Sequence, residues 1–334
     1  MKVALFSSRP QFGYWLALAW LALLAGAGLL APLLPLPYAA ANADLQHIAT
    51  PPEWSAPSAH YLGTDSLGRD VLAGLLAGAR RLLVLSLPAV VLATVAGALA
   101  GAAAGFWGNR GLRLPVAVAA AALAALWWGL ELPLSSMPYW LLGIAIILSL
   151  VSWRLYRLAA RWLSFALPLD SLVLGIVTLL GAVPRLILLL VLVAGPTPTQ
   201  AQFLGVLILL AWPDAARLVR GQMLRVRVQP FVEAARASGL HAGRIWWRHA
   251  LPHACRPLLA FAPLSLASLI ALESALAFLG IGQGPDIVSW GSILASMRQD
   301  PTTWWVAAGP GVALLATLLA LQAVAKARQL EVNN

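Results

Sequence analysis

Charged residues are scarce in this chain of 334 residues. Aspartate, glutamate, lysine and arginine together account for 10% of the sequence, whereas a soluble domain carries roughly 25%. Hydrophobic residues account for 61%, and the mean hydropathy is +0.83. This balance excludes an ordinary soluble domain. It predicts an all-α, polytopic membrane protein, because helices satisfy their own backbone hydrogen bonds within a bilayer.

Cysteine and lysine are nearly absent. The single cysteine, Cys255, excludes an intramolecular disulfide and a cysteine-rich metal site. The only lysines, Lys2 and Lys326, do not follow glycine, so the chain lacks the Gly-Lys-Ser/Thr of a phosphate-binding loop. It also lacks His-Glu-x-x-His and Gly-x-Ser-x-Gly. We therefore expect no catalytic residue and no cofactor in this chain, and we expect any ATP and Mg²⁺ to be bound by another chain.

Histidine occurs five times, and one pair has a spacing that can hold a metal ion. His249 and His253 are at i, i+4, which places both on one face of a helix. Pro252 interrupts that helix, however, and the neighbouring sequence has no carboxylate. Because a good site needs three or four converging ligands, we predict no metal site in the chain.

Positive charge is distributed unequally along the chain. The net charge is +10, and 17 of the 22 lysine and arginine residues fall in segments that the apolar runs place on one side of a membrane. Four fall on the other side, and Arg185 lies inside a span. The positive-inside rule then places both termini in the cytoplasm, and the excess charge needs no nucleic-acid partner. Tryptophans near span ends agree with an interfacial belt; they are Trp15, Trp107, Trp153, Trp212, Trp304 and Trp305.

The apolar runs divide the chain into six segments. They are residues 1–37, a tail and the first span; 38–81, an external segment with an amphipathic helix; 82–109, the second span and an inside turn; 110–167, a segment with two further apolar runs; 168–325, the remaining spans with a cytoplasmic loop at 217–256; and 326–334, a cytoplasmic tail. We interpret the first apolar run, Trp15 to about Leu34, as a retained anchor. A cleaved signal peptide is the alternative, because residues 39–43 are similar to a signal-peptidase site, but the run exceeds the usual length of about 7–15 residues.

Residues 110–167 contain two short apolar runs, Leu114–Leu130 and Met137–Trp153. Each has about 17 residues, the lower limit for a helix that crosses a bilayer. Basic residues flank the outer ends of the pair, and Glu131 lies in the turn between the runs. This pattern predicts a two-span hairpin with both outer ends inside. The alternative is a re-entrant or interfacial loop. The stretch that follows sets three arginines on one helical face, so we expect it to lie along the inner membrane surface; they are Arg154, Arg157 and Arg161.

The longest polar, basic stretch of the chain runs from residue 233 to residue 252 and carries a distinctive spacing. A Glu-Ala-Ala triplet is followed by glycine four residues after its second alanine, and by Leu-Pro beginning twelve residues after the glycine. The spaced residues are Glu233, Ala234, Ala235, Gly239, Leu251 and Pro252. The alanines favour a helix that a partner can approach closely. Glycine can take the left-handed conformation that ends a helix, and a glutamate in the first turn is favoured by the helix dipole.

This spacing resembles the EAA loop of the membrane subunits of bacterial ABC importers, a cytoplasmic helix-turn-helix that docks on the ATPase subunit. A second motif, His60-Tyr-Leu-Gly-Thr-Asp-Ser-Leu-Gly-Arg-Asp70, resembles the segment before the second span in permeases of the dipeptide, oligopeptide and nickel import family. Its motif residues are Gly63, Thr64, Asp65, Gly68, Arg69 and Asp70. The ending of the fourth span at 211–220, the ending of the fifth at 272–282 and Ser-Trp-Gly at 289–291 are also similar to that family.

The external motif has two interpretations. In the first it forms a surface near the mouth of the pathway or the dock of a binding protein. In the second Asp65 caps an amphipathic helix that lies on the bilayer, with Val71, Leu72, Leu75 and Leu76 on its apolar face.

Two ionisable residues lie within predicted spans. Arg185 follows Pro184 in the third span, which departs from the family pattern because Gly175 and Thr178 stand where an arginine and a second aspartate are expected. Glu273 lies in the fifth span. An unpaired charge there costs about 2.5–3.5 kcal/mol on insertion scales, so each residue should contact protein, water or an opposite charge. Glu273 is either a pathway residue, with Arg185 as its partner, or a packing residue.

The resemblance implies a core of six spans, in which residues 110–167 are an insertion. With the predicted two-span hairpin, the chain would have eight spans. It implies a permease subunit in the bacterial inner membrane that works with a second homologous permease, two ABC ATPases and an extracytoplasmic binding protein. The solute would be a peptide, or a nickel or metallophore complex. The alternatives are an ion-coupled secondary carrier, which often shows inverted repeats that we do not find here, and a membrane scaffold that transports nothing.

Overall fold

The computed structural model describes residues 12–34, 40–54, 60–111, 113–115, 164–185, 187, 199–281, 284 and 287–333. The principal elements are α1 (Phe12–Leu30), η1 (Ala31–Leu33), α2 (Val71–Arg81), η2 (Leu82–Ser86), α3 (Leu87–Trp107), β1 (Arg113–Pro115), β2 (Ser164–Ala166), α6 (Leu169–Ala182), α8 (Gln200–Val226), α9 (Pro230–Ala237), α10 (Ala242–Ile245), η4 (Trp246–Ala250), α11 (Leu251–Ala254), α12 (Leu258–Leu279), α13 (Trp290–Ser296) and α14 (Trp304–Asn333). They belong to a larger unit, residues 1–102 with 177–334, and a smaller unit, residues 103–176.

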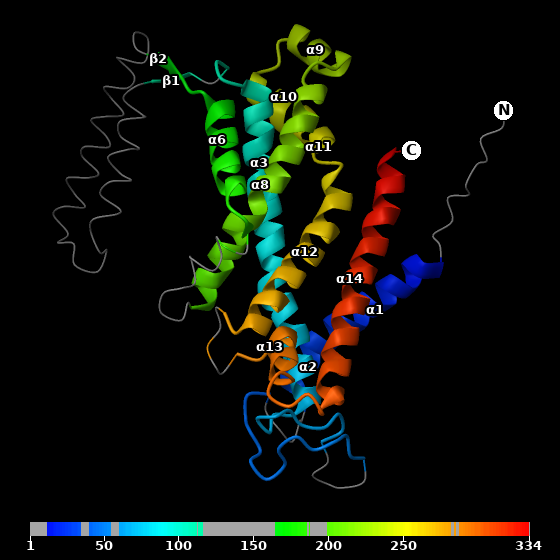
Figure 1. The fold of residues 1–334 in the computed structure, drawn as a ribbon. Coiled ribbons are helices and arrows are strands. Elements are labelled where there is room, and N and C mark those ends of the chain that lie inside the picture. The colour runs from blue at the N-terminus through cyan, green and yellow to red at the C-terminus, as the bar shows by residue number, and fades with distance from the viewer. Residues whose placement is uncertain are drawn as a thin grey trace, which may run out of the picture. The chain divides into compact units, whose positions relative to one another are not determined.

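Five helical segments in the described residues are long and apolar enough to cross a membrane (Figure 1); they are Phe12–Leu33, Val71–Trp107, Gln200–Val226, Leu258–Leu279 and Trp304–Glu331. The prediction of an all-α, multi-pass fold is thereby confirmed. The predicted third span corresponds to α6, whose described part has 14 residues. The predicted second span begins earlier than expected, because α2, η2 and α3 form one continuous helical segment of 37 residues.

The predicted hairpin between residues 114 and 153 and the basic stretch at 154–161 lie outside the described residues, so the eight-span prediction stays a prediction. The smaller unit describes the two ends of this insertion. β1 and β2 pair antiparallel, with Arg113 opposite Ala166 and Pro115 opposite Ser164. Just outside this ladder, the side-chain amide of Asn109 donates to the Ser171 hydroxyl, and its carbonyl accepts from the Ser171 backbone N–H, both at 2.9 Å. The two ends of the insertion therefore lie side by side within this unit.

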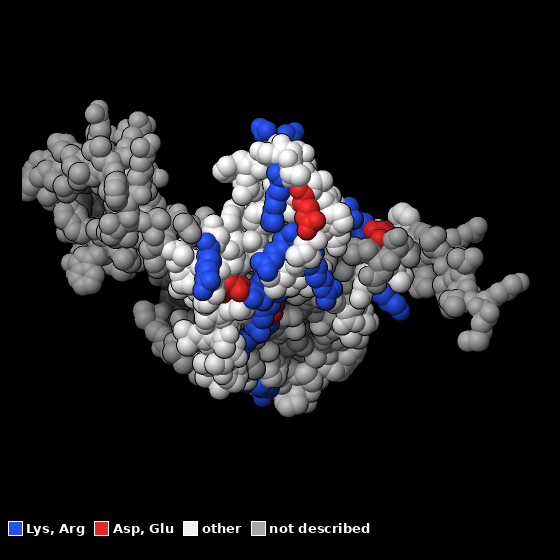
Figure 2. All heavy atoms as spheres, turned by 90° about the horizontal axis from the view of Figure 1, so that it is seen from above, with Lys and Arg blue, Asp and Glu red and all other residues white. Residues whose placement is uncertain are grey.

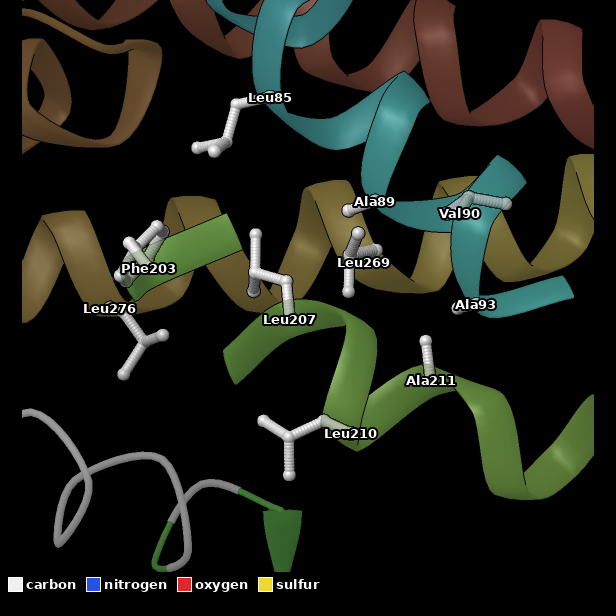
Figure 3. Packing of buried hydrophobic residues seen from close by; sticks show 10 residues of the cluster. All are labelled: Leu85, Ala89, Val90, Ala93, Phe203, Leu207, Leu210, Ala211, Leu269 and Leu276. Atoms are coloured by element: carbon white, nitrogen blue, oxygen red, sulfur yellow. The ribbon is translucent and has the colours of Figure 1, made fainter. Parts of the chain in front are cut away.

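The core of the larger unit lies where η2 and α3 meet α8 and α12 (Figure 3). Its buried side chains are Leu85, Ala89, Val90, Ala93, Phe203, Leu207, Leu210, Ala211, Leu269 and Leu276. Lipid tails are as apolar as leucine, so close packing rather than removal from water must hold such helices together. The many small residues on α3 permit that close packing.

Two glycines on α3 set its distance from α8. A Cβ atom at Gly97 would lie 2.4 Å from the carbonyl oxygen of Trp212, and one at Gly101 would lie 2.2 Å from that of Ala216. The four-residue spacing places both glycines on the same face of α3, as in the Gly-x-x-x-Gly pattern of membrane helix pairs. The two backbones can approach this closely only because neither glycine has a side chain.

Replacing Gly101 with valine should therefore force α3 and α8 apart. The obstacle is backbone, which cannot rotate away, so we expect the change to lower the free energy of unfolding by about 3 kcal/mol, the upper part of the range for overpacking. Gly205→Val on α8 is the matched control, because a Cβ atom at Gly205 meets nothing within 4 Å. Thermal unfolding of both variants in mild detergent makes the comparison, and equal midpoints would contradict the proposed contact.

Candidate functional site

The residues of the Glu-Ala-Ala motif form a short helix and the turn that ends it. α9 begins with Pro230, a favoured first residue of a helix, and Glu233 lies in its first turn. Gly239 has a φ of 75°, its N–H donates to the Arg236 carbonyl at 3.0 Å, and the next N–H, of Leu240, reaches back to the Ala235 carbonyl at 3.2 Å. The predicted left-handed glycine turn is confirmed.

The Leu-Pro pair that ends the spaced motif starts another short helix. α10 and the π-turn η4 lead into α11, where Leu251 and Pro252 are the first residues. The α8 helix continues to Val226, so the first ten residues of the predicted loop at 217–256 are helical rather than loop. The segment α9–α11 thus joins α8 to α12 (Figure 1).

Each part of the α9–α11 segment contributes buried apolar side chains. Val232 on α9, Ile245 on α10 and Ala250 on η4 are at most 1% exposed. The motif residues are more accessible: Glu233, Ala234, Gly239 and Pro252 are exposed, and Ala235 and Leu251 are half-buried. The structure therefore brings all six residues onto one short segment and leaves four of them accessible to a partner.

Basic side chains surround these helices. Figure 2 shows this end of the molecule, where Lys and Arg outnumber Asp and Glu. The exposed arginines of residues 217–256 are Arg217, Arg225, Arg236, Arg244, Arg248 and Arg256. Large apolar side chains are exposed in the same region, with Val228 65% and Trp247 61% accessible. Exposed apolar groups among cations are typical of a surface that another protein covers.

The two histidines of this region make local contacts. The Nδ1 of His253 lies 2.8 Å from the carbonyl oxygen of His249, and the His253 ring packs on Phe231 with a centroid distance of 4.9 Å. These contacts hold the α9–α11 segment together.

The motif at residues 60–70 lies at the opposite end of the helices of the larger unit (Figure 1). Our assignment of Asp65 as the cap of the following helix is wrong. The cap of α2 is Asp70, whose Oδ1 accepts from the Ala73 N–H at 2.7 Å. Asp65 instead closes a local turn by accepting from the N–H groups of Leu67 and Arg69 at 2.9 and 2.8 Å. Both carboxylates are buried.

Glycines in the 60–70 motif allow close backbone contacts. Gly63 and Gly68 have φ values of 76° and 74°. A Cβ atom would lie 2.6 Å from the Thr50 carbonyl oxygen at the first and 2.3 Å from the Asp44 carbonyl oxygen at the second. Thr64 is fully buried, and its carbonyl accepts from the Trp305 indole N–H of α14 at 3.1 Å. Most of the motif therefore forms an internal framework rather than a docking surface.

The helix that follows the motif does not lie separately on a bilayer. The side chains of α2 pack against α1, α13 and α14, with Val71, Ala73, Gly74, Gly78 and Ala79 buried. The Trp290 indole N–H of the Ser-Trp-Gly motif donates to the Leu75 carbonyl at 2.9 Å. Next to it, Gly291 lets α13 approach α12, because a Cβ atom there would lie 2.2 Å from the Ser274 carbonyl oxygen. Ser-Trp-Gly therefore holds α13 between α2 and α12.

Glu273 lies in the C-terminal half of α12 and is 4% exposed. Its Oε1 accepts from the Arg81 guanidinium at 2.6 Å, and its Oε2 accepts from the Ser86 hydroxyl at 2.5 Å. Arg185, which we considered as its partner, pairs instead with Asp214 on α8. Glu273 and Arg185 are thus each paired with a residue of opposite charge, as the cost of placing a charge in a membrane requires. They are not paired with each other.

A π-turn explains how Arg81 and Ser86 reach the same carboxylate. With about 3.6 residues per turn, residues five apart would point in different directions from a regular α-helix. In η2 the chain follows the i→i+5 pattern of a π-helix, and the N–H of Leu87 bonds to the Leu82 carbonyl. This pattern aligns residues five apart. The sequence analysis missed Arg81, although a basic residue at the edge of an apolar run, five before a serine, was a signal for it.

The fold and the site together define a class of protein. Long apolar helices carry, at one end, a short helix-turn-helix with an accessible Glu-Ala-Ala motif, and exposed arginines surround it. This is the architecture of a membrane permease subunit.

Comparison with known proteins identifies the family. The model of the family described as binding-protein-dependent transport system inner membrane component matches residues 156–329, more than half of the chain. The chain belongs to this family, and it is a multi-pass inner-membrane permease subunit of an ABC transporter. It is therefore not itself an enzyme.

Curated relatives agree with this membership. A putative peptide permease protein of Brucella suis biovar 1 (strain 1330) is 29% identical over 292 residues, which cover 86% of this chain and 75% of the relative. The di/tripeptide transport system permease protein DppC of Pseudomonas aeruginosa (strain UCBPP-PA14) is 29% identical over 288 residues, covering 85% and 76%. A putative peptide transport system permease protein of Brucella suis is 32% identical over 185 residues, covering 55% and 62%.

Proposed function

We propose that this chain forms half of the translocation pathway of an ATP-driven importer of short peptides, and that a second homologous permease subunit forms the other half. In this arrangement α9–α11 and both termini lie in the cytoplasm. Two ATPase subunits bind ATP and Mg²⁺, and one of them docks on α9–α11. An extracytoplasmic binding protein delivers the solute at the end that carries the 60–70 motif.

The observation that carries this proposal is the exposure of the Glu-Ala-Ala motif on a helix that also has a buried residue. Glu233, Ala234 and Gly239 are accessible, while Val232 beneath them is completely buried. A partner that closes on ATP binding can therefore push α9 as a unit, and the movement passes to α8 and α12, which the segment joins. Rigid-body rocking of packed helices is a common way to alternate access to a central site.

Peptides are the proposed solutes because the names of several relatives state peptide or di/tripeptide transport. A nickel or metallophore complex is the competing solute. For Glu273 and Arg185 we propose a packing role, since each is held by an opposite charge at a helix contact.

The proposal is tested by purifying the full chain in mild detergent from its own membranes and reconstituting the intact assembly in vesicles. We expect a second permease and two chains with phosphate-binding loops to co-purify. With its binding protein, the assembly should accumulate labelled di- and tripeptides only when ATP is present. Accumulation driven by an ion gradient without ATP would contradict the proposal, and ATP-driven uptake of nickel or its chelates alone would replace the peptide with the competing solute.

A further inference from the structure

We propose that Asp44, His47 and His60 bind a first-row divalent metal ion, with Zn²⁺ as the best match, at the end of the molecule opposite α9–α11. One ligand atom from each side chain lies within 4.8 Å of the other two. The sequence analysis missed this group because the residues are separated by up to 16 positions, and only the fold brings them together. The site is independent of the proposed transport function.

The geometry of the three side chains is close to that of a metal site. His47 Nδ1 lies 2.9 Å from Asp44 Oδ2, and His60 Nε2 lies 3.6 Å from the same oxygen. Around a tetrahedral Zn²⁺ with bonds of about 2.0–2.1 Å, neighbouring ligand atoms are about 3.3–3.4 Å apart. These two distances lie on either side of this value, and the two histidine ligand atoms lie within 4.8 Å of each other, so the three side chains converge as a metal site requires.

The orientation of His60 is the strongest sign of a metal ligand. This side chain is 4% exposed, and its Nδ1 lies 2.8 Å from the Asp70 carboxylate. If Nδ1 carries the proton and donates to Asp70, the lone pair of Nε2 points toward Asp44. Histidines that bind metals usually donate their other N–H to a carboxylate in this way, which fixes the tautomer and makes the ring more basic.

The backbone around the other two ligands is held as well. The Asp44 N–H donates to the Gly68 carbonyl at 2.8 Å, and the Thr64 hydroxyl donates to the His47 carbonyl at 2.5 Å. Both residues are therefore in position before any ion arrives.

The donor set selects the class of ion. Two imidazole nitrogens and one carboxylate oxygen suit Zn²⁺ and its first-row neighbours, whereas Mg²⁺ and Ca²⁺ prefer oxygen ligands throughout. Three protein ligands leave a fourth position for water. The side chain of His47 is 43% exposed, so the ion can enter from solvent. If His47 binds through Nδ1, its proton resides on Nε2, and any second proton on the ring is released to solvent.

A bound ion would connect two parts of one segment. Asp44 and His47 follow the first span, whereas His60 lies beside the turn that ends at Asp70 and caps α2. The ion would therefore fix the segment that covers the start of α2.

The test is a Zn²⁺ and Co²⁺ titration of the metal-stripped full chain in lipid nanodiscs, purified with a tag that contains no histidine. We expect one Zn²⁺ per chain, and a Co²⁺ absorption spectrum of a tetrahedral site that Zn²⁺ abolishes. His47→Ala and Asp44→Asn should each weaken Zn²⁺ binding by at least about tenfold. Asp70→Asn should weaken it by about 10–100-fold, as expected when a group that orients a ligand is changed.

Asp70→Asn is informative because asparagine still caps a helix but cannot hold His60 in the same tautomer. Two matched controls lie at the opposite end of the molecule, in the α9–α11 segment: His241→Asn, which preserves the cap of α10, and Cys255→Ser. Both should bind Zn²⁺ like the parent chain. Thermal unfolding without metal confirms that each variant is folded. The proposal is overturned if the parent chain binds Zn²⁺ no more tightly than about 1 mM, or if His47→Ala and Asp44→Asn bind it with unchanged affinity.

Discussion

Replacing Gly239 with proline should abolish substrate-stimulated ATP hydrolysis by the assembled transporter, while the chain still inserts into the membrane. Gly239 has a φ of 75°, and its N–H donates to the Arg236 carbonyl. Proline fixes φ near about −65° and has no N–H, so both features are lost together. The turn that positions α9 is then destroyed, and the partner finds no ordered helix to push.

Gly239→Asn is the matched control for this change. Asparagine is the residue other than glycine that most readily adopts the left-handed conformation, and a side chain at this position meets nothing within 4 Å. We expect Gly239→Asn to retain most of the stimulation, measured as phosphate release with and without substrate-loaded binding protein. Normal stimulation in Gly239→Pro would refute the assignment of α9 as the coupling helix. Loss in both variants would assign the effect to the side chain rather than to the turn.

Replacing Glu273 with alanine should strongly destabilise the bundle. The side chain of Arg81 is 15% exposed, and Glu273 is its ion-pair partner in the described part of the chain. Removal of one member of a buried ion pair leaves an uncompensated charge, which costs about 3–5 kcal/mol. The Ser86 hydroxyl loses its acceptor at the same time. We expect a large fall in the thermal midpoint of the detergent-solubilised chain.

The double variant Arg81→Met with Glu273→Met separates packing from transport. An ion pair replaced as a whole by apolar side chains of similar volume is often neutral or stabilising, so the double variant should recover the stability that Glu273→Ala loses. If the pair serves packing, peptide uptake recovers as well. Restored stability without uptake would instead give Glu273 a role in the pathway. A Glu273→Ala chain as stable as the parent would mean that the ion pair does not stabilise the fold.

Helix α9 and the turn that ends it show how much a local pattern can predict. Glu233 in the first turn, the alanines after it and the left-handed turn at Gly239 all follow from contacts within ten residues, and the structure has each of them. The capping aspartate shows the limit of such reasoning. Asp65 and Asp70 both precede the apolar face of α2, and either can accept a backbone N–H. Only the folded segment shows that Asp65 closes its own turn and that Asp70 begins the helix.

The sequence by itself determined the class of protein and the approximate positions of the spans, and it predicted the place where a partner would couple. These depend on apolar length, on the side that carries arginine and on spacings within one helix or turn. Tertiary structure alone decided which charges meet: Arg81 with Glu273, Arg185 with Asp214, and Asp44 with two histidines. Apart from Asp44 and His47, which are three residues apart, these partners come from different helices or loops. Their pairing depends on helix rotation and, for Arg81, on the extra residue of a π-turn. A charge in a membrane span requires a partner, but the sequence around it does not specify which helix provides that partner.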